Sequence, residues 1–246
     1  MRIVTTKTEN KVRQDFEEVK NAVKNIKRQL PFMFGNTTYS QFGEDLYLLN
    51  CMRAKRQNYG SLNKGFFVDI GAHHPFRYST TALFYEEMGW TGINIEPNPD
   101  GIQEFNNYRP NDINLNFGVA NEDGELKYFM FNDPAFNSFS EEFSEECVQG
   151  GGSLKLLETR NIPVRKLSTL LEQHLPQGQE IDFFSIDAEG LDLEILKSNN
   201  WQKFRPEFIL IEINHDKDNG IHKFLVEQNY SMVNLALITA IYQRKD

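Results

Sequence analysis

The sequence predicts a doubly wound α/β fold with a mostly parallel sheet and an antiparallel edge at its C-terminal end. Short apolar runs such as 65–71, 91–96 and 208–213 alternate with segments of helical periodicity, which is typical of a parallel sheet covered on both faces. Acidic residues stand at the ends of these runs. The length of 246 residues and the net charge of −9 suit one large α/β domain.

The first thirty residues carry an amphipathic pattern that predicts an N-terminal helical extension over residues 1–38. Apolar side chains recur at alternating spacings of four and three residues: Val12, Phe16, Val19, Val23, Ile26 and Leu30. Pro31 ends the pattern. Two interpretations stay open, a homodimer formed through the helix over 12–30 and packing of that helix on the protein's own body.

The domain over residues 39–246 is predicted to begin with a helix and then to alternate strand and helix. The first helix starts near residues 39–41, with Ser40 as its N-cap. The elements that follow are strands over 65–71, 91–96 and 113–120 and helices over 79–88 and 99–108. After an interruption, the alternation resumes with strands over 162–167, 181–187 and 208–213, helices over 168–174, 192–198 and 222–228, and a closing pair of strands over 230–244.

The interruption predicts an insertion at about residues 125–155. A strand over 125–131 precedes an irregular segment rich in phenylalanine, which ends in the glycines 150–152. Aromatic side chains are interleaved here with small polar ones: Tyr128, Phe129, Phe131, Asn132, Asp133, Phe136, Asn137, Ser138, Phe139 and Phe143. Two interpretations stay open, an acceptor site with a lid that stacks aromatic faces on a sugar ring and a local hydrophobic cluster.

Composition argues against several classes of protein. No apolar run approaches the ~18 residues of a membrane-spanning helix, and no apolar segment typical of a secretory signal follows Met1. The two cysteines, Cys51 and Cys147, form no CxxC pair, so the sequence predicts neither a disulfide framework nor a zinc site and favours the cytoplasm. The acidic balance argues against nucleic acid as a partner, because phosphate contacts need clustered lysine and arginine.

The end of the first predicted strand favours ligand binding. In open α/β sheets, ligands bind beyond the carboxyl ends of the strands, where Asp69 and Gly71 stand. Gly71 allows a tight turn and a close approach of a ligand to the backbone. A dinucleotide fingerprint would need glycines where His73 and Phe76 stand, so a pyrophosphate at this turn is disfavoured.

Glu96 closes the next strand, 25 residues after Gly71. An acid at this place can accept hydrogen bonds from both hydroxyls of a ribose. Because Asp69, Gly71 and Glu96 occur without the triple glycine, the pattern suits a nucleoside ligand that lacks a diphosphate. S-adenosylmethionine (SAM) is the commonest such ligand.

Two further strand ends add carboxylates and a histidine to the same crevice. Asp187 and Glu189 follow one strand, and Glu212 and His215 follow the next. Capping of the helix over 192–198 is the structural alternative for Asp187 or Glu189. Since all these strand ends meet at one edge of the sheet, we expect a crevice rich in carboxylates.

Five segments form a wider pattern: 39–45 (YSQFGED), 67–73 (FVDIGAH), 94–97 (NIEP), 184–190 (FSIDAEG) and 205–212 (RPEFILIE). In this order and spacing they resemble the FkbM family of SAM-dependent methyltransferases. The resemblance implies a class I methyltransferase fold with a seven-stranded sheet, and O-methylation of a glycan, a polysaccharide or a glycosylated metabolite. The cofactor-binding residues that it implies are Gln41, Asp69, Gly71, Ala72, His73, Thr80, Glu96, Pro97, Asn98, Gly118 and Asp187.

A sugar hydroxyl is a weak nucleophile, so we expect a general base near the methyl donor. The candidates for this base are His73, His74, Asp187, Glu189 and His215. We favour the acid pair Asp187 and Glu189 with His215 in support, and His73 as a further catalytic candidate. A divalent ion that bridges Asp187 and Glu212 is a further option, although no metal site is predicted.

Two other classes of function stay open. A nicotinamide-dependent oxidoreductase or epimerase acting on nucleotide sugars would share the fold but would need the missing glycines. A non-catalytic nucleoside-binding module would use its N-terminal helix to recruit a partner. For an enzyme that methylates sugars, the net charge of −9 suits a neutral acceptor better than a strongly anionic one.

Overall fold

A computed structural model describes residues 37–56, 62, 64–150, 152–188, 190–213 and 220–245. The chain divides into two units, residues 1–38 and residues 39–246. The helix predicted over 12–30, and the dimer through it, lie outside the described residues and stay predictions. The fold below is that of the second unit.

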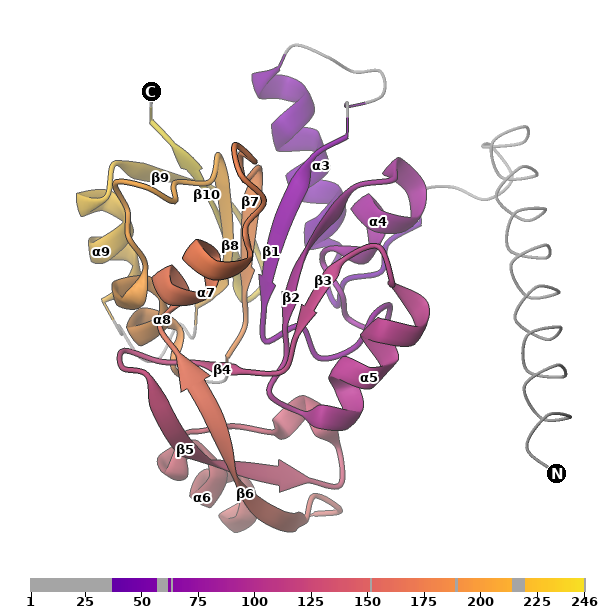
Figure 1. Ribbon diagram of the computed structural model, residues 1–246, viewed down its shortest axis with the longest axis vertical. Helices are drawn as coiled ribbons and strands as arrows, with labels where there is room; N and C mark the ends of the chain where they lie inside the picture. Colours follow the sequence, from indigo (N-terminus) through magenta and orange to yellow (C-terminus); the bar gives the residue numbers. More distant parts are fainter. Residues whose placement is uncertain are drawn as a thin grey trace, which may run out of the picture. The chain divides into compact units, whose positions relative to one another are not determined.

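A seven-stranded sheet forms the centre of this unit, in the order β3-β2-β1-β7-β8-β10-β9 (Figure 1). The strands are β1 (Phe66–Ile70), β2 (Thr91–Ile95), β3 (Ile113–Leu115), β7 (Phe183–Ile186), β8 (Phe208–Glu212), β9 (Tyr230–Ala236) and β10 (Thr239–Arg244). The pairs from β3 to β8 are parallel, and β10 is antiparallel to both β8 and β9. The predicted doubly wound fold with an antiparallel C-terminal edge is confirmed.

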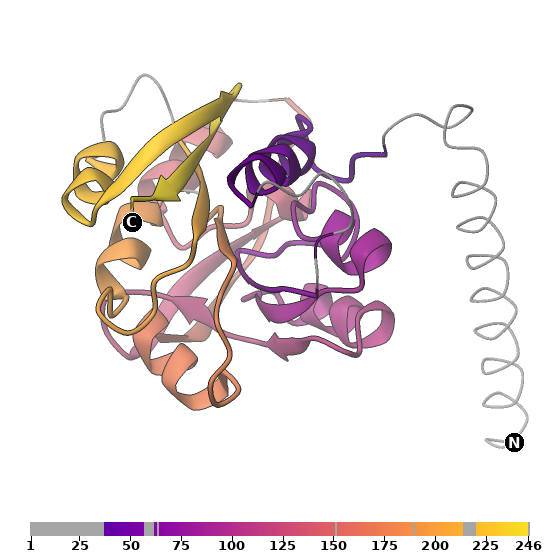
Figure 2. The same ribbon diagram turned by 90° about the horizontal axis from the view of Figure 1, so that it is seen from above.

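Helices cover both faces of this sheet (Figure 2). They are α3 (Glu44–Lys55), α4 (Ala82–Met88), α5 (Pro99–Tyr108), α7 (Leu167–His174), α8 (Asp192–Ser198) and α9 (Ile221–Glu227). Neighbouring residues of β1 point to opposite faces, as in any strand. Phe67 packs in the core that includes residues of α3 and α4, whereas Val68 packs in the core that includes residues of α7, α8 and α9. Both faces of β1 are therefore buried, which explains why this strand is apolar except for Asp69 near its end.

Two helix starts illustrate how local sequence sets the boundaries. The α5 helix spans the predicted 99–108, since Asn98 caps it by accepting a hydrogen bond from the Asp100 amide and Pro99 is its first residue. The prediction that Ser40 is an N-cap is wrong, because α3 begins only after Gly43, whose φ is 81°. The Ser40 hydroxyl instead donates to Asp45 Oδ1 at 2.9 Å.

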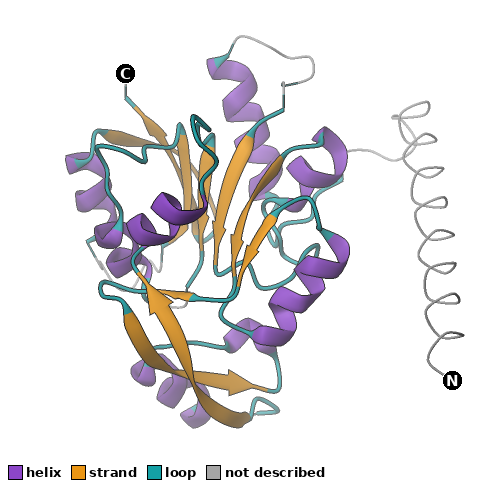
Figure 3. Cartoon of the chain, viewed as in Figure 1, coloured by secondary structure: helices purple, strands orange, loops and turns teal. Residues whose placement is uncertain are grey.

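The chain between β3 and α7 builds a second sheet in the order β4-β6-β5. Its strands are β4 (Gly118–Val119), β5 (Gly124–Phe131) and β6 (Leu156–Arg165), and a 3-10 turn, η1 (Pro134–Phe136), and the helix α6 (Glu141–Gln149) lie between β5 and β6. The carboxyl ends of the central strands point toward this second sheet (Figure 3). The second sheet is therefore placed to form one wall of a site at those strand ends.

Three expectations for this region are corrected. The run over 113–120 is two short strands in two sheets rather than one strand. The chain turns between them, where the side-chain amide of Asn116 (Nδ2) donates to the carbonyls of Glu96 and Pro97. The segment predicted as irregular contains α6, and β6 begins six residues before the predicted strand. In α6 the buried residue is Ser144, so the helix shows no apolar stripe in the sequence.

Within the described residues, no helix combines the length and the hydropathy that crossing a membrane requires.

Candidate functional site

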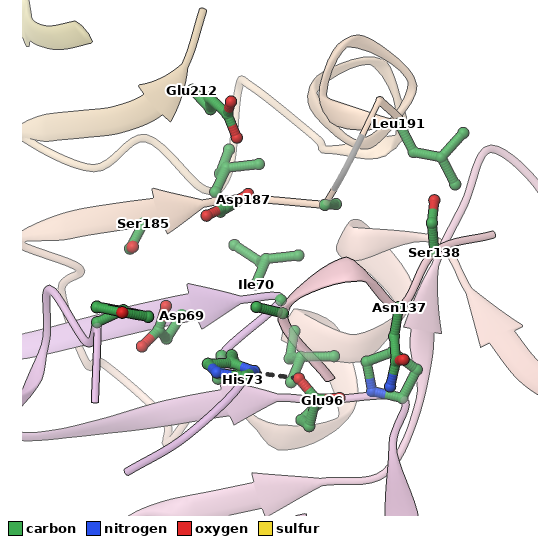
Figure 4. Close-up of a pocket in the computed structure, with 18 of the residues that line it drawn as sticks. Asp69, Ile70, His73, Glu96, Asn137, Ser138, Ser185, Asp187, Leu191 and Glu212 are labelled. Carbon is green, nitrogen blue, oxygen red and sulfur yellow. Dashed lines mark hydrogen bonds between the residues drawn. The ribbon is translucent and has the colours of Figure 1, made fainter. Parts of the chain in front are cut away.

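A cavity of about 490 Å³ lies at the carboxyl ends of the central strands (Figure 4). It is bounded by the ends of β1, β2 and β7 and by residues of the insertion. The predicted cofactor-binding residues that line it are Gln41, Asp69, Gly71, Ala72, His73, Thr80, Glu96, Pro97, Gly118 and Asp187. Asn98 is not among the described lining residues and contacts Glu96 instead. Most of the predicted set therefore shares one cavity.

Gly71 occupies a position that admits no side chain. Its φ is +74°, and a Cβ built on it would lie 1.8 Å from the carbonyl oxygen of Asp187. The β1 and β7 strands approach each other here, since the Asp187 amide donates to the Ile70 carbonyl at 3.1 Å. Glycine is required both by the left-handed conformation and by this close approach of the Asp187 carbonyl, and Gly71 also lines the cavity.

Glu96 is a buried carboxylate that organises two turns of the site. Its side chain is drawn beside His73 in Figure 4, where the His73 amide donates to Oε2 at 2.8 Å. The Asn98 amide donates to Oε1 at 2.7 Å. Burial raises the pKa of Glu96 to about 7, because the two amide hydrogen bonds compensate only part of the desolvation of the charge. A carboxylate has about four acceptor positions, so each oxygen retains capacity for a ligand hydroxyl.

Asp69 belongs to a buried hydrogen-bonded network that the sequence did not reveal. The Thr81 hydroxyl donates to Asp69 Oδ2 at 2.7 Å, and Arg109 Nη1 donates to the Thr81 hydroxyl oxygen at 2.9 Å. Arg109 Nη1 also donates to the Pro75 carbonyl, and its Nε donates to Asp112 Oδ2. The side chains of Arg109 and Asp112 are completely buried. The pKa of Asp69 is raised by burial, and the Thr81 hydrogen bond and the Arg109 charge oppose this shift.

This network holds the loop that follows β1 against the sheet. Arg109 directly follows α5, where a cation is ordinarily an exposed partner of the helix dipole. Its guanidinium carbon lies within 5.2 Å of the ring centroids of Phe67, Tyr85 and Phe105. The burial of Arg109 could not be predicted from the residues near it in the sequence, because the three rings belong to three separate elements.

The two histidines after Gly71 differ in their surroundings. His74 Nδ1 accepts hydrogen bonds from the amides of Phe76 and Arg77, and its Nε2 lies 3.3 Å from Glu104, so His74 shapes the turn. His73 lines the cavity, and its Nε2 is buried without a hydrogen-bond partner among the described residues. Burial lowers the pKa of His73, which favours the neutral imidazole, the form that can accept a proton.

Asp187 is an exposed carboxylate at the end of β7, near Ser185 and Glu212 in the close-up view (Figure 4). The following turn is capped by Asp192, whose carboxylate accepts hydrogen bonds from the amides of Ala188 and Gly190. Burial raises the pKa of Asp192 to about 6. Asp192, the first residue of α8, thus holds the turn before the helix, and the N-cap residue Leu191 makes no side-chain capping hydrogen bond. Capping by Asp187 or Glu189 therefore stays an untested alternative. Glu189 and His215 lie outside the described residues, and their catalytic roles stay predictions.

The insertion supplies the wall that faces the strand ends. Of its predicted aromatic and polar residues, those that line the cavity are Tyr128, Asp133, Phe136, Asn137, Ser138, Phe139 and Phe143. The Asn137 side chain accepts from the Phe131 amide at 2.7 Å, which fixes its position. The Tyr128 and Phe139 rings are 4.6 Å apart, and a Cβ on Gly118 would lie 2.4 Å from Phe139. Gly118 therefore makes room for an aromatic ring of this wall.

Among the described residues, no group of three or more histidine, cysteine, aspartate or glutamate side chains is arranged to hold a metal ion.

The family model described as the methyltransferase FkbM domain matches residues 69–232. The matched span covers well over half of the chain and includes the strand ends that carry Asp69, Glu96, Asp187 and Glu212. No curated protein and no solved structure matches the chain.

Proposed function

The chain belongs to the FkbM family of methyltransferases, and we propose that it transfers the methyl group of SAM to a hydroxyl of a sugar-containing acceptor. The observation that carries the choice of cofactor is the placement of Gly71 and Glu96 directly after the ends of the neighbouring strands β1 and β2. A bare, left-handed backbone and a buried carboxylate on the neighbouring strand are the two features that a nucleoside ligand needs there.

The residues of this site fit the adenosyl part of SAM. Glu96 can accept hydrogen bonds from both ribose hydroxyls while it keeps the amide hydrogen bonds of His73 and Asn98. Gly71 lets the ends of β1 and β7 meet closely, and its own backbone lines the cavity where the ligand would lie. The loop after β1 is held rigid by Arg109, so the site is organised before the ligand arrives.

When bound, SAM supplies an activated methyl group that needs only a correctly oriented nucleophile. The proposed roles of the protein are to orient the acceptor and to accept the proton of its hydroxyl. Asn137 and Ser138 provide polar partners for hydroxyl groups, and the ring of Phe136 provides a face for the C–H bonds of a sugar.

For the proton, we propose the acid pair Asp187 and Glu189, with His215 in support and the buried Nε2 of His73 as the alternative. A divalent ion between Asp187 and Glu212 remains an option of the same proposal. We further propose the cytoplasm as the site of action, which suits the observation that Cys51 and Cys147 form no disulfide.

The proposed cofactor is tested by titrating the protein with S-adenosylhomocysteine in a calorimeter. The variant Glu96→Ala removes both acceptor oxygens and is expected to weaken binding by ~2–4 kcal/mol, or roughly thirty- to thousand-fold. The variant Glu158→Ala is the control, since it removes an exposed carboxylate whose partner is Arg160. An unchanged dissociation constant in Glu96→Ala would remove this residue from the site.

Two further measurements separate the alternatives. Thermal stabilisation by NAD but not by S-adenosylhomocysteine would favour an oxidoreductase or epimerase and overturn the proposal. Incubation with labelled SAM and a panel of free oligosaccharides, lipid-linked glycans and nucleotide sugars tests the acceptor class. Cofactor binding without label transfer to any panel member would favour the nucleoside-binding module.

A further inference from the structure

The charges on the cavity wall are strongly unequal. Among the described lining residues there are six carboxylates and one guanidinium: Glu44, Asp69, Glu96, Asp133, Asp187, Glu212 and Arg77. Burial lowers the pKa of His73, so this residue adds little positive charge near pH 7. Burial also raises the pKa of Glu96 to about 7, so Glu96 is only partly ionised there. An anionic group that entered this cavity would meet carboxylates on most sides.

Arg77 is therefore the cation on which recognition of an anion would depend, and it is already paired. Its Nη2 lies 3.5 Å from Asp133 Oδ1, and the two side chains are 51% and 42% exposed. Arg77 comes from the loop after β1, whereas Asp133 comes from the turn after β5. The pair thus joins the strand-end side of the cavity to the insertion.

The position of Asp133 does not depend on this pairing. Its Oδ1 also accepts the Ala135 amide at 3.2 Å, as the N-cap of η1. The carboxylate therefore stays at the cavity wall whether or not Arg77 approaches it. An acceptor anion would have to compete with a fixed intramolecular carboxylate for Arg77.

We propose that Asp133 is a specificity-determining residue that neutralises Arg77 and thereby disfavours anionic acceptors, such as sugar phosphates and uronic acids, relative to uncharged sugars. This inference rests on the proposed function, because it concerns the acceptor of the same methyl transfer. The physical basis is repulsion between like charges, which selects partners more strongly than it contributes to affinity.

The test uses matched neutral and anionic acceptors: methyl glycosides of common hexoses, the corresponding hexuronic acid glycosides and the hexose 6-phosphates. Asp133→Asn retains the size of the side chain and the oxygen that caps η1, but it removes the charge. In this variant we expect kcat/KM for anionic acceptors to rise about two- to five-fold relative to neutral ones. Arg77→Gln is expected to change the same ratio in the opposite direction, because it leaves the Asp133 charge uncompensated.

Glu172→Gln is the matched control. It removes a carboxylate from the exposed pair that Glu172 makes with Lys203 at 3.3 Å, and neither residue is among the described cavity-lining residues. The net charge changes as in Asp133→Asn, so an unaltered acceptor ratio in Glu172→Gln assigns the effect to the position of Asp133. Unchanged binding of S-adenosylhomocysteine by Asp133→Asn confirms that the variant is folded.

The inference is overturned if the wild-type protein prefers the anionic acceptors, or if Asp133→Asn changes the rates for neutral and anionic acceptors by the same factor. Either result would leave methyl transfer to sugars intact. Absence of transfer to every acceptor, by a protein that binds S-adenosylhomocysteine, would instead overturn the proposed function itself.

Discussion

The two walls of the cavity are held in different ways. The strand-end wall, defined by Asp69, Gly71 and Glu96, has carboxylates that are each 4% exposed and hydrogen-bonded to hydroxyl or amide groups. The insertion wall, defined by Asp133 and Phe136, presents a half-exposed ion pair and an aromatic ring that is 39% exposed. Buried polar groups are costly to leave unpaired, so the first wall is rigid, whereas the second can change without unfolding the protein.

The sharpest way to break this comparison is to remove the arginine buried behind the strand-end wall and the arginine that pairs with the insertion wall. Arg109→Met is expected to lower the free energy of unfolding by about 3–5 kcal/mol, because it leaves the buried Asp112 without its cation. Arg77→Met should cost only about 0–1 kcal/mol, since its ion pair is exposed. Urea denaturation of both variants provides the measurement. Equal losses would show that the two walls do not differ in this way.

The next effect concerns two glycines with the same backbone conformation. Gly71→Ala places a Cβ 1.8 Å from the Asp187 carbonyl, in addition to the cost of about 1–2 kcal/mol for a left-handed alanine. We expect affinity for S-adenosylhomocysteine to fall about ten-fold or more, because the end of β1 must move. Gly178→Ala is the control, since its φ is +76° and no atom lies within 4 Å of the added Cβ. It should lose stability but keep the affinity, and a similar loss of affinity in both variants would contradict the assignment.

A third prediction concerns the pH dependence of cofactor binding. The pKa of Glu96 is about 7, and ribose hydroxyls donate more strongly to the ionised carboxylate than to the protonated one. Binding therefore favours loss of the proton, and affinity should rise with pH through 7 and level off above it. We expect about ten-fold weaker binding of S-adenosylhomocysteine at pH 6 than at pH 8. Calorimetry over this range should show a flat profile in Glu96→Gln, and a persisting slope would assign the titration to another group.

The smallest effect is expected on the insertion wall. Phe136→Ala removes a lining ring without disturbing a buried contact, so binding of S-adenosylhomocysteine should not change. The KM for the acceptor should rise about two- to five-fold, equivalent to about 0.5–1 kcal/mol of lost stacking. Val148→Ala, an exposed position of α6 outside the described lining, is the control. A change in cofactor affinity would show that the two walls are not independent.

The fold could be predicted in most of its parts because apolar periodicity reports burial. The inner strands β1, β7 and β8 are buried on both faces, so each appears as a largely apolar run. The errors lie where burial is weak or where the chain changes sheets. The α6 helix buries only Ser144, and the single run over 113–120 serves two sheets because Asn116 hydrogen-bonds to the turn after β2.

The candidate site divides in the same manner. Gly71 and Glu96 were predictable because their chemistry follows from their place at the ends of adjacent strands. Arg109 was not, because an arginine after a helix ordinarily faces water, and its burial depends on rings from three elements. The role of Asp192 was missed for a related reason, since its hydrogen bonds to the amides of Ala188 and Gly190 depend on the geometry of the turn before α8.

By itself, the sequence determined most strands and helices of the central sheet and its cover, the parallel character of that sheet and the polar groups at the strand ends. These properties depend on the pattern of residues within each element and on the order of the elements along the chain. The tertiary structure alone decided that Arg109 lies behind Asp69 and that Asp133 meets Arg77, 56 residues away in the chain. Contacts of this kind depend on how separate elements pack against one another. The periodicity of residues within a single segment contains no information on that packing.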